Sequence, residues 1–172
     1  MEETTNKKSR IVPYFILMIL IILADQITKA VVFGNLSSEK TIIENLFSIS
    51  PTVNNGVSFG LFADKSWARP VFISVSAVAI AVFFMVFILS LKGNFFLKTS
   101  LVLIISGAAG NFIDRIIIGG VRDFISVHFF PAIFNVADSA LVVGCVVLVF
   151  YFLFIDKNAV FKSKKKASSV NN

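Results

Sequence analysis

The chain has 172 residues, of which 56% are hydrophobic and only 15% are charged, and its formal net charge at pH 7 is +6. This composition excludes a soluble domain of the same size, because the surface of such a domain must be mostly wet. The single cysteine excludes an internal disulfide framework and a cysteine-based metal site. We therefore expect an integral membrane protein.

Along the chain, four segments are long and apolar enough to cross a bilayer as helices. They are residues 11–33, 68–91, 97–118 and 134–155. The apolar run of the first is too long for a cleaved signal peptide, and no small-residue cleavage site follows it. The sequence therefore predicts one membrane-embedded domain, residues 1–172, with outer loops 34–67 and 119–133 and tails 1–10 and 156–172.

Most of the basic residues flank these spans on one side. They are Lys7, Lys8, Arg10, Lys92, Lys98, Lys157, Lys162, Lys164, Lys165 and Lys166. Such a distribution is typical of membrane topology and argues against nucleic acid as the partner of the positive charge. The positive-inside rule predicts that both termini are cytoplasmic and that the loops 34–67 and 119–133 face outward.

The first outer loop contains apolar-alternating runs around Asn54, Asn55 and Gly56. Asn-Gly is a strong signal for a hairpin turn, because both residues tolerate a positive φ. We expect a hairpin turn at this point and a small β element on the outer membrane surface.

Five ionisable residues fall inside the expected spans: Asp25, Lys29, Asp114, Arg115 and Asp138. From the rise of an α-helix, Asp25 lies ~21 Å from the cytoplasmic start of its span, Asp114 lies ~25 Å along its span, and Asp138 lies ~6 Å into a span that starts outside. All of them therefore lie toward the outer face, in one layer. A proton-coupled transporter needs polar groups at the midplane as well.

Two motifs within the spans leave alternatives open. In "ADQITK", Asp25 and Lys29 share a helix face, as a local ion pair or as the wall of a polar site. In "GAAGNFIDR", small residues allow another helix to approach closely, and Asn111, Asp114 and Arg115 share a face. These three form either a packing patch with an internal Asp–Arg pair or, as we favour, a support for catalytic groups.

The motifs "VRDF" and "FNVADSAL" carry the strongest chemical signal. Taken alone, Asp138 could simply cap its helix, and Asp123 could be a solvated loop charge paired with Arg122. Two carboxylates at one depth, with Asn135 a turn from Asp138, favour a dyad that shares a proton. The ionised carboxylate then takes a proton from a water that attacks a peptide carbonyl, and the protonated one donates to the developing oxyanion.

A zinc-based hydrolytic site has no support in the sequence. One histidine, one cysteine and no H-E-x-x-H motif leave no zinc set, and the G-x-G-D motif of other intramembrane aspartic proteases is also absent. We expect neither a metal nor a cofactor. His128 is interpreted as an interfacial residue.

The motifs "DQITK", "NNGVSF", "GAAGNFIDR", "VRDF" and "FNVADSAL", in this order and spacing, resemble those of lipoprotein signal peptidase, the signal peptidase II family. The resemblance runs along nearly the whole chain. It implies an all-α integral membrane fold of four transmembrane helices, with a small extracytoplasmic β-cradle and a short outer helix.

The same resemblance implies an intramembrane aspartic endopeptidase of the bacterial cytoplasmic membrane that cuts signal peptides from diacylglyceryl-modified prolipoproteins just before the lipidated cysteine. It implies Asp123 and Asp138 as the catalytic dyad, and as lining or supporting residues Asp25, Lys29, Asn54, Gly56, Asn111, Asp114, Arg115, Asn135 and Ala137. The expected partners are the lipidated substrate, membrane lipid and globomycin-like cyclic inhibitors, and we expect a monomer. The alternative from another class is a small proton-coupled transporter or a membrane assembly factor.

Overall fold

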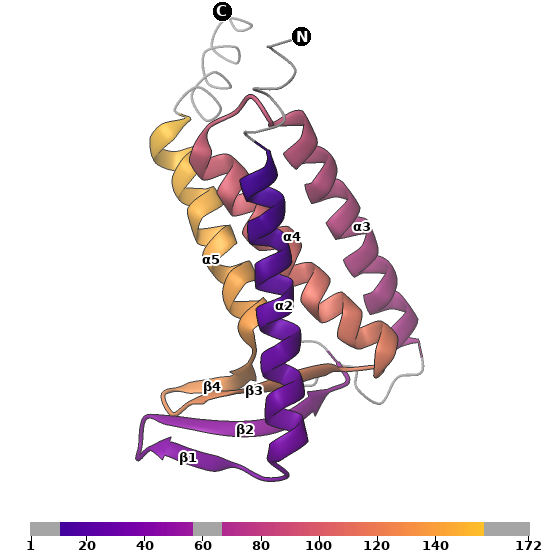
Figure 1. The fold of residues 1–172 in the computed structure, drawn as a ribbon, viewed down its shortest axis with the longest axis vertical. Helices are drawn as coiled ribbons and strands as arrows, with labels where there is room; N and C mark the ends of the chain where they lie inside the picture. Colours follow the sequence, from indigo (N-terminus) through magenta and orange to yellow (C-terminus); the bar gives the residue numbers. More distant parts are fainter. Residues whose placement is uncertain (1–10, 57–66, 157–172) are drawn as a thin grey trace, which may run out of the picture.

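The computed structural model describes residues 11–56 and 67–156; the expected terminal tails, apart from Asp156, lie outside this part of the chain. Four long helices stand beside one another, and an antiparallel sheet closes one end of the bundle (Figure 1). The elements in chain order are α2 (Val12–Asn35), β1 (Lys40–Ile43), β2 (Phe47–Asn54), α3 (Ala68–Leu89), α4 (Phe95–Ile117), β3 (Val121–Val127), β4 (Phe130–Phe134), α5 (Val136–Phe150) and the π-helical turn η2 (Tyr151–Ile155).

The four expected membrane spans are confirmed as helices. The helices Val12–Asn35, Ala68–Leu89 and Phe95–Ile117 and the continuous segment Val136–Ile155 are long and apolar enough to cross a membrane. A helix satisfies its backbone polar groups internally, which is what a lipid environment requires. The start of α2 and the end of η2 lie at the end of the bundle opposite the sheet (Figure 1).

Residues with a preference for helix starts mark the start of three of the helices. Pro13 lies in the first turn of α2, where its missing N–H costs nothing. Asn94 caps α4 by accepting a hydrogen bond from the Phe96 amide at 2.8 Å. Asn135 and Asp138 form a capping box at the start of α5.

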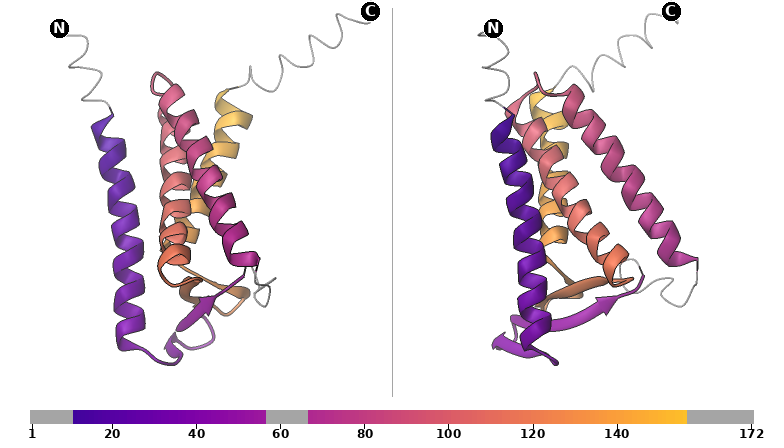
Figure 2. Two further views of the ribbon diagram at one scale, coloured as in Figure 1. Left: turned by 90° about the vertical axis from the view of Figure 1, so that its right-hand side faces the viewer. Right: turned by 45° about the vertical axis from the view of Figure 1, so that its right-hand side comes forward.

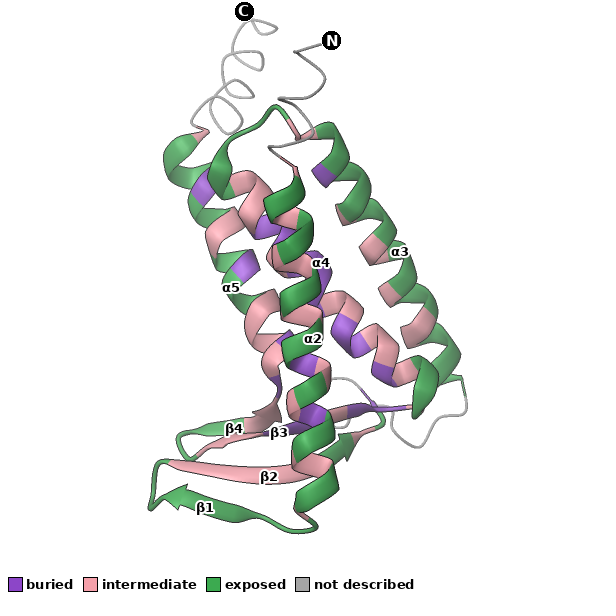
Figure 3. Ribbon diagram, viewed as in Figure 1, coloured by how far each residue is buried: buried purple, intermediate pink, exposed green. Residues whose placement is uncertain are grey.

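Helix α4 is the central element of the bundle and packs against α2, α3 and α5 (Figure 2). In the most apolar stretch of α4, half of the residues are buried; in the corresponding stretches of α3 and of the Val136–Ile155 helix, 6% and 11% are buried. The outer faces of α2, α3 and α5 expose isoleucine, leucine, valine and phenylalanine side chains over much of their length (Figure 3). Such a surface fits a lipid surround and not water.

The small residues of α4 and α5 allow these two helices to approach closely, as the sequence predicts. A Cβ added to Gly107 would collide with the Ala137 carbonyl and lie 2.9 Å from the Leu141 amide. A Cβ on Gly144 of α5 would lie 2.9 Å from the Ile104 amide. Backbone therefore meets backbone at this interface.

Gly107→Ala is accordingly expected to lower the free energy of unfolding by about 3 kcal/mol, because the clash is with backbone atoms that cannot rotate away. Thermal unfolding of the purified protein in detergent measures the effect. Gly34→Ala is the matched control, since a Cβ there meets nothing within 4 Å. Equal melting temperatures for the two variants would contradict the close helix contact.

The sheet joins two segments that are far apart in the sequence. Its strand order is β1-β2-β3-β4, and every neighbouring pair is antiparallel. The pairing of β2 with β3 sets Thr52 opposite Asp123, Val53 opposite Arg122 and Asn54 opposite Val121. The two outer loops are therefore one structure, and their pairing brings Asn54 close to Asp123.

One expectation about the outer loops is wrong. The hairpin turn is not at Asn54-Asn55-Gly56 but at residues 44–46, where Asn45 adopts a φ of 56°, and Asn54 ends β2. The loop 119–133, expected only as an outward-facing loop, forms the hairpin of β3 and β4. The short outer helix is not among the helices of residues 11–56 and 67–156, and residues 57–66 of the first outer loop lie outside the described part.

Candidate active site

The buried charges of the described residues lie where the bundle meets the sheet. Asp25, Lys29 and Asp114 are fully buried, and Asp123 is 4% exposed. Hydrogen bonds link all four, directly or through buried asparagines, into one network. This arrangement agrees with the single polar layer expected from the depth of these residues in the spans.

Asp123 on β3 and Asp138 on α5 are brought together by Asn135, which is fully buried. The Asn135 Nδ2 donates to Asp123 Oδ1 at 2.6 Å, and its backbone N–H donates to Asp138 Oδ2 at 3.2 Å. One residue therefore holds both carboxylates. The same Nδ2 group also reaches the Asn111 Oδ1, at 3.1 Å, and the Arg122 carbonyl, at 3.3 Å.

Asp123 has an environment that favours its protonated form. Burial, and next the charge of Asp138, raise the pKa of Asp123 to about 6, although hydrogen bonds from Asn135 and Asn54 act in the opposite direction. The Asn54 Nδ2 donates to Asp123 Oδ2 at 3.3 Å, and the Asn54 Oδ1 accepts from the Gly56 amide at 3.1 Å. Gly56 thus fixes the orientation of the Asn54 amide, so that its donor faces the carboxylate.

Asp138 has an environment rich in donors. Its Oδ1 accepts from Asn111 Nδ2 at 2.7 Å, in addition to the bond from the Asn135 backbone. Asp138 is the third residue of α5, where the helix dipole favours a negative charge. The capping role considered for Asp138 is therefore present, and it coexists with a position beside Asp123.

Lys29 orients the amide that binds Asp138. Its Nζ lies 2.8 Å from Asp25 Oδ2, 3.3 Å from Asp114 Oδ2 and 3.1 Å from Asn111 Oδ1. Because the Asn111 oxygen faces the lysine, its NH₂ group is turned toward Asp138. Asp25 and Lys29 are therefore the ion pair considered for "ADQITK", and they also belong to the buried polar layer.

Asp25 also binds the helix that carries Asp138. Its Oδ1 accepts from the Ala137 amide at 2.9 Å, across 112 residues of sequence. Ala137 is fully buried, and a Cβ on Gly110 would lie 2.6 Å from Asp25 Oδ2. Small residues at both positions let the carboxylate reach the first turn of α5.

Two pairings considered from the sequence are wrong. Asp114 does not pair with Arg115, and Arg122 does not pair with Asp123; instead Arg122 Nη2 lies 2.7 Å from Asp114 Oδ1. Arg115 donates to the Asn111 carbonyl at 3.5 Å, and its charge interacts with Asp138 and Asp123. The favoured interpretation of "GAAGNFIDR" as a support for the two aspartates fits these contacts.

Sequence reasoning missed two members of the network, Gln26 and Arg122. Gln26 Nε2 donates to Asp25 Oδ2 at 3.0 Å and to Asp114 Oδ1 at 3.3 Å, and its Oε1 accepts from Arg122 Nη2 at 3.0 Å. Both residues stand next to a site residue in the sequence. That adjacency was the available signal, but it does not say which way a side chain points.

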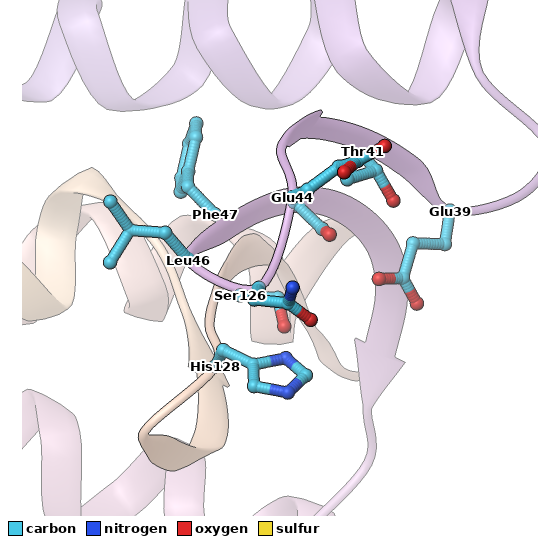
Figure 4. Close-up of a pocket in the computed structure, with 9 residues that line it drawn as sticks. Glu39, Thr41, Glu44, Leu46, Phe47, Ser126 and His128 are labelled. Carbon is cyan, nitrogen blue, oxygen red and sulfur yellow. The ribbon is translucent and has the colours of Figure 1, made fainter.

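Neither Asp123 nor Asp138 lines either of two cavities formed by described residues. One of about 320 Å³ is on the sheet, where Glu39, Glu44 and His128 are among the lining side chains (Figure 4). The other, of about 360 Å³, is lined by Leu20, Ile21, Ala24, Leu103, Val136, Ser139, Ala140 and Val143. Within residues 11–56 and 67–156, no three His, Cys, Asp or Glu side chains are grouped so that they could hold a metal ion.

Fold and site together define a membrane protein with four candidate spans and a buried carboxylate network at one end of its bundle. Residues 17–154 match the family model described as signal peptidase (SPase) II. The chain belongs to the signal peptidase II family and is therefore a peptidase, as the motif resemblance predicts.

Individual relatives agree with this assignment. The lipoprotein signal peptidase of Clostridioides difficile (strain 630) is 37% identical over 149 residues, which cover 85% of this chain and 98% of the relative. That of Pseudomonas paraeruginosa (strain DSM 24068 / PA7) is 36% identical over 168 residues, covering 92% and 94%. A bacterial membrane enzyme solved by the in meso method at 2.3 Å resolution superposes with a TM-score of 0.74 at 26% identity, covering 86% of this chain and 92% of that one.

Proposed function

We propose that the chain removes signal peptides from diacylglyceryl-modified prolipoproteins, cutting just before the lipidated cysteine, and that Asp123 and Asp138 perform the hydrolysis. Family membership supports the substrate class, since the relatives above are lipoprotein signal peptidases. The observation that carries the mechanism is that Asn135 binds both carboxylates. By the same resemblance, we expect the enzyme to act as a monomer, without a cofactor, and to be inhibited by globomycin-like cyclic peptides.

In this mechanism Asp138 is the base. It accepts hydrogen bonds from Asn111 and from the Asn135 backbone, and in its ionised form it takes a proton from a water molecule. The resulting hydroxide attacks the carbonyl carbon of the scissile peptide bond. Asp123 in its protonated form donates to the carbonyl oxygen, so that a neutral tetrahedral diol forms.

Collapse of the diol then breaks the C–N bond. Asp138 returns the proton it took, to the leaving amine nitrogen, and Asp123 recovers its own proton from the collapsing hydroxyl. Both carboxyl groups thus end in their starting states. The raised pKa of Asp123, about 6, supports its role as the proton donor of the pair.

The remaining site residues have supporting roles in the proposal. Asn54 and Asn111 each hold one carboxylate, and Arg115 contributes a positive charge beside the pair. Gly56 orients the Asn54 amide, and the small Ala137 lets Asp25 reach the first turn of α5.

The proposal also includes the orientation in the membrane. The basic residues that flank the spans support cytoplasmic termini, and the sheet lies at the other end of the bundle (Figure 1). The site is then near the outer face, where a diacylglyceryl group anchors its cysteine in the outer leaflet. Phe129, which is 82% exposed at the tip of the β3–β4 hairpin, fits a place in that leaflet.

The experiment that tests the proposed substrate compares two forms of one prolipoprotein, with and without the diacylglyceryl group. The purified enzyme in lipid nanodiscs is expected to cleave the lipidated form, and mass spectrometry is expected to find the new N-terminus at the lipidated cysteine. Equal cleavage of the unlipidated form, or a cut at another bond, would contradict the proposal.

The mechanism predicts a descending alkaline limb in the pH profile of kcat/KM. Since the pKa of Asp123 is raised to about 6, its protonated form is present below that pH and is lost as the pH rises through it. The rate is therefore expected to fall by about tenfold per pH unit above this limb. The profile is measured from initial rates with the lipidated substrate between about pH 5 and about pH 9.

Asn54→Leu tests whether Asp123 is the group that causes this alkaline limb. The Asn54 hydrogen bond lowers the pKa of Asp123, so its loss is expected to raise this pKa and move the limb to higher pH. Ser48→Leu, on the same strand but paired with Ser126 and not with Asp123, is the control expected to leave the limb in place. A limb that does not move in Asn54→Leu would exclude Asp123 as the group that titrates.

A further inference from the structure

Arg122 and Asp123 are neighbours on β3, but their side chains have different partners. Asp123 is bound by Asn135 and Asn54. The Arg122 side chain is bound by Asp114 of α4 and Gln26 of α2. This is the alternation of a strand: one residue reaches the dyad and the next reaches the helices.

Asp114 holds Arg122 at three points. Its Oδ1 lies 2.7 Å from Arg122 Nη2, and its Oδ2 lies 3.3 Å from Nε and 2.9 Å from the Arg122 backbone N. Asp114 is fully buried, whereas the Arg122 side chain is 18% exposed. The two-point contact with the side chain requires the planar guanidinium, which a lysine cannot imitate.

Gln26 joins this pair to α2. Its Oε1 accepts from Arg122 Nη2 at 3.0 Å, while its Nε2 donates to Asp114 Oδ1 at 3.3 Å and to the Gly110 carbonyl at 3.1 Å. The three side chains of Gln26, Asp114 and Arg122, here called the β3 clamp, therefore connect three elements. Asp114 also lies 3.3 Å from Lys29 Nζ, which links the clamp to the rest of the buried layer.

Around Asp123, β3 pairs with one strand only. Its partner at Val121, Arg122 and Asp123 is β2, and β4 joins only at Ile125 and Val127. Asn135 binds the Asp123 carboxylate and the Arg122 carbonyl, while the Arg122 side chain contacts Asp114 of α4. The clamp therefore ties β3 to α4 at the residue next to Asp123.

We propose that Arg122 is a positioning residue of the peptidase: through the β3 clamp it fixes Asp123 at the distance from Asp138 that proton transfer requires. The inference rests on the proposed function of the two aspartates. Arg122 touches neither substrate nor the reacting atoms in this proposal. Its loss therefore changes the rate of the chemical step and not the binding of the lipidated substrate.

The test compares Arg122→Met and Arg122→Lys with wild type in the lipidated-substrate assay. We expect Arg122→Met to lower kcat by about 100-fold with KM changed by less than about twofold, since a displacement of about 1 Å is enough for such a loss. Arg122→Lys keeps a positive charge beside Asp114 but loses the two-point contact of the guanidinium, so its expected loss in kcat is only about 10-fold. Gln26→Leu keeps the Arg122–Asp114 pair and is expected to lose about 5-fold in kcat.

Arg69→Met is the matched control, since Arg69 also binds the sheet end of α4, through the Ile116 carbonyl at 3.2 Å. It is expected to keep the wild-type kcat. Melting temperatures in detergent identify any variant that does not fold; if Arg122→Met fails to fold, Arg122→Lys and Gln26→Leu decide. A wild-type kcat in the folded variants of the clamp, or a rise in KM that accounts for the whole loss, overturns the proposal.

Asp123→Asn in the same assay separates this inference from the proposed function. If Asp123→Asn cleaves normally, the dyad itself is wrong. If Asp123→Asn is inactive while Arg122→Lys and Gln26→Leu turn over at the wild-type rate, the dyad stands and the clamp does not position it.

Discussion

Asp123→Asn and Asp138→Asn are each expected to lower kcat by at least about 10³-fold, because each removes one of the two groups that move protons in the proposed reaction. An asparagine at position 138 cannot take a proton from water. An asparagine at position 123 cannot give one to the carbonyl oxygen. Cleavage of the lipidated prolipoprotein, followed by mass spectrometry with purified variants, measures the loss.

Glu44→Gln is the matched control for these variants. Glu44 is an exposed carboxylate in the turn between β1 and β2 and lines the cavity of about 320 Å³, to which neither Asp123 nor Asp138 contributes (Figure 4). It is expected to keep the wild-type kcat, and all three variants are expected to fold, since the side-chain volume hardly changes. Near-normal cleavage by either dyad variant would show that the pair is not catalytic.

Lys29→Met is expected to have the largest effect on stability, a loss of roughly 3–5 kcal/mol in the free energy of unfolding. Lys29 is fully buried between Asp25 and Asp114, which are also fully buried. Removal of the cation leaves two carboxylates in a layer that water does not reach, and each becomes costly to keep ionised. Unfolding by denaturant in mixed micelles measures the change.

Lys40→Met is the control for this second prediction, because Lys40 is exposed on β1 and a surface substitution of this kind changes stability by less than about 0.5 kcal/mol. Lys29→Met should also lower activity, since Lys29 orients the amide of Asn111 that binds Asp138. A fully stable Lys29→Met protein would contradict the burial of this ion network.

The helical part of the fold could be predicted from the sequence because a membrane span is a local property. About 20 apolar residues in a row are sufficient evidence for a spanning helix, whatever the rest of the chain does. The sheet could not be predicted in the same way, since β2 and β3 pair although the whole of α3 and α4 lies between them in the sequence. The Asn-Gly signal was misleading for this reason: Asn54 ends a strand whose partner is β3, and the local turn is at Asn45.

The site shows the same division between local and distant interactions. The Asp25–Lys29 pair was predictable because i, i+4 residues meet on any helix. The partner of Asp114 could not be predicted in this way. Arg122 lies on β3, beyond the end of α4, and contacts Asp114 only because the chain changes direction between these two elements. Gln26 has no apparent role until α2 lies against α4, and it was therefore missed.

The claim that Asp123 and Asp138 work as one unit is tested most directly by the double variant Asp123→Asn/Asp138→Asn, measured beside both single variants under single-turnover conditions. If the two carboxyl groups share one reaction, the second substitution removes nothing that the first has left, and the double variant is expected to cleave about as slowly as each single variant. Losses that multiply, or a single variant close to the wild-type rate, would contradict a shared active site.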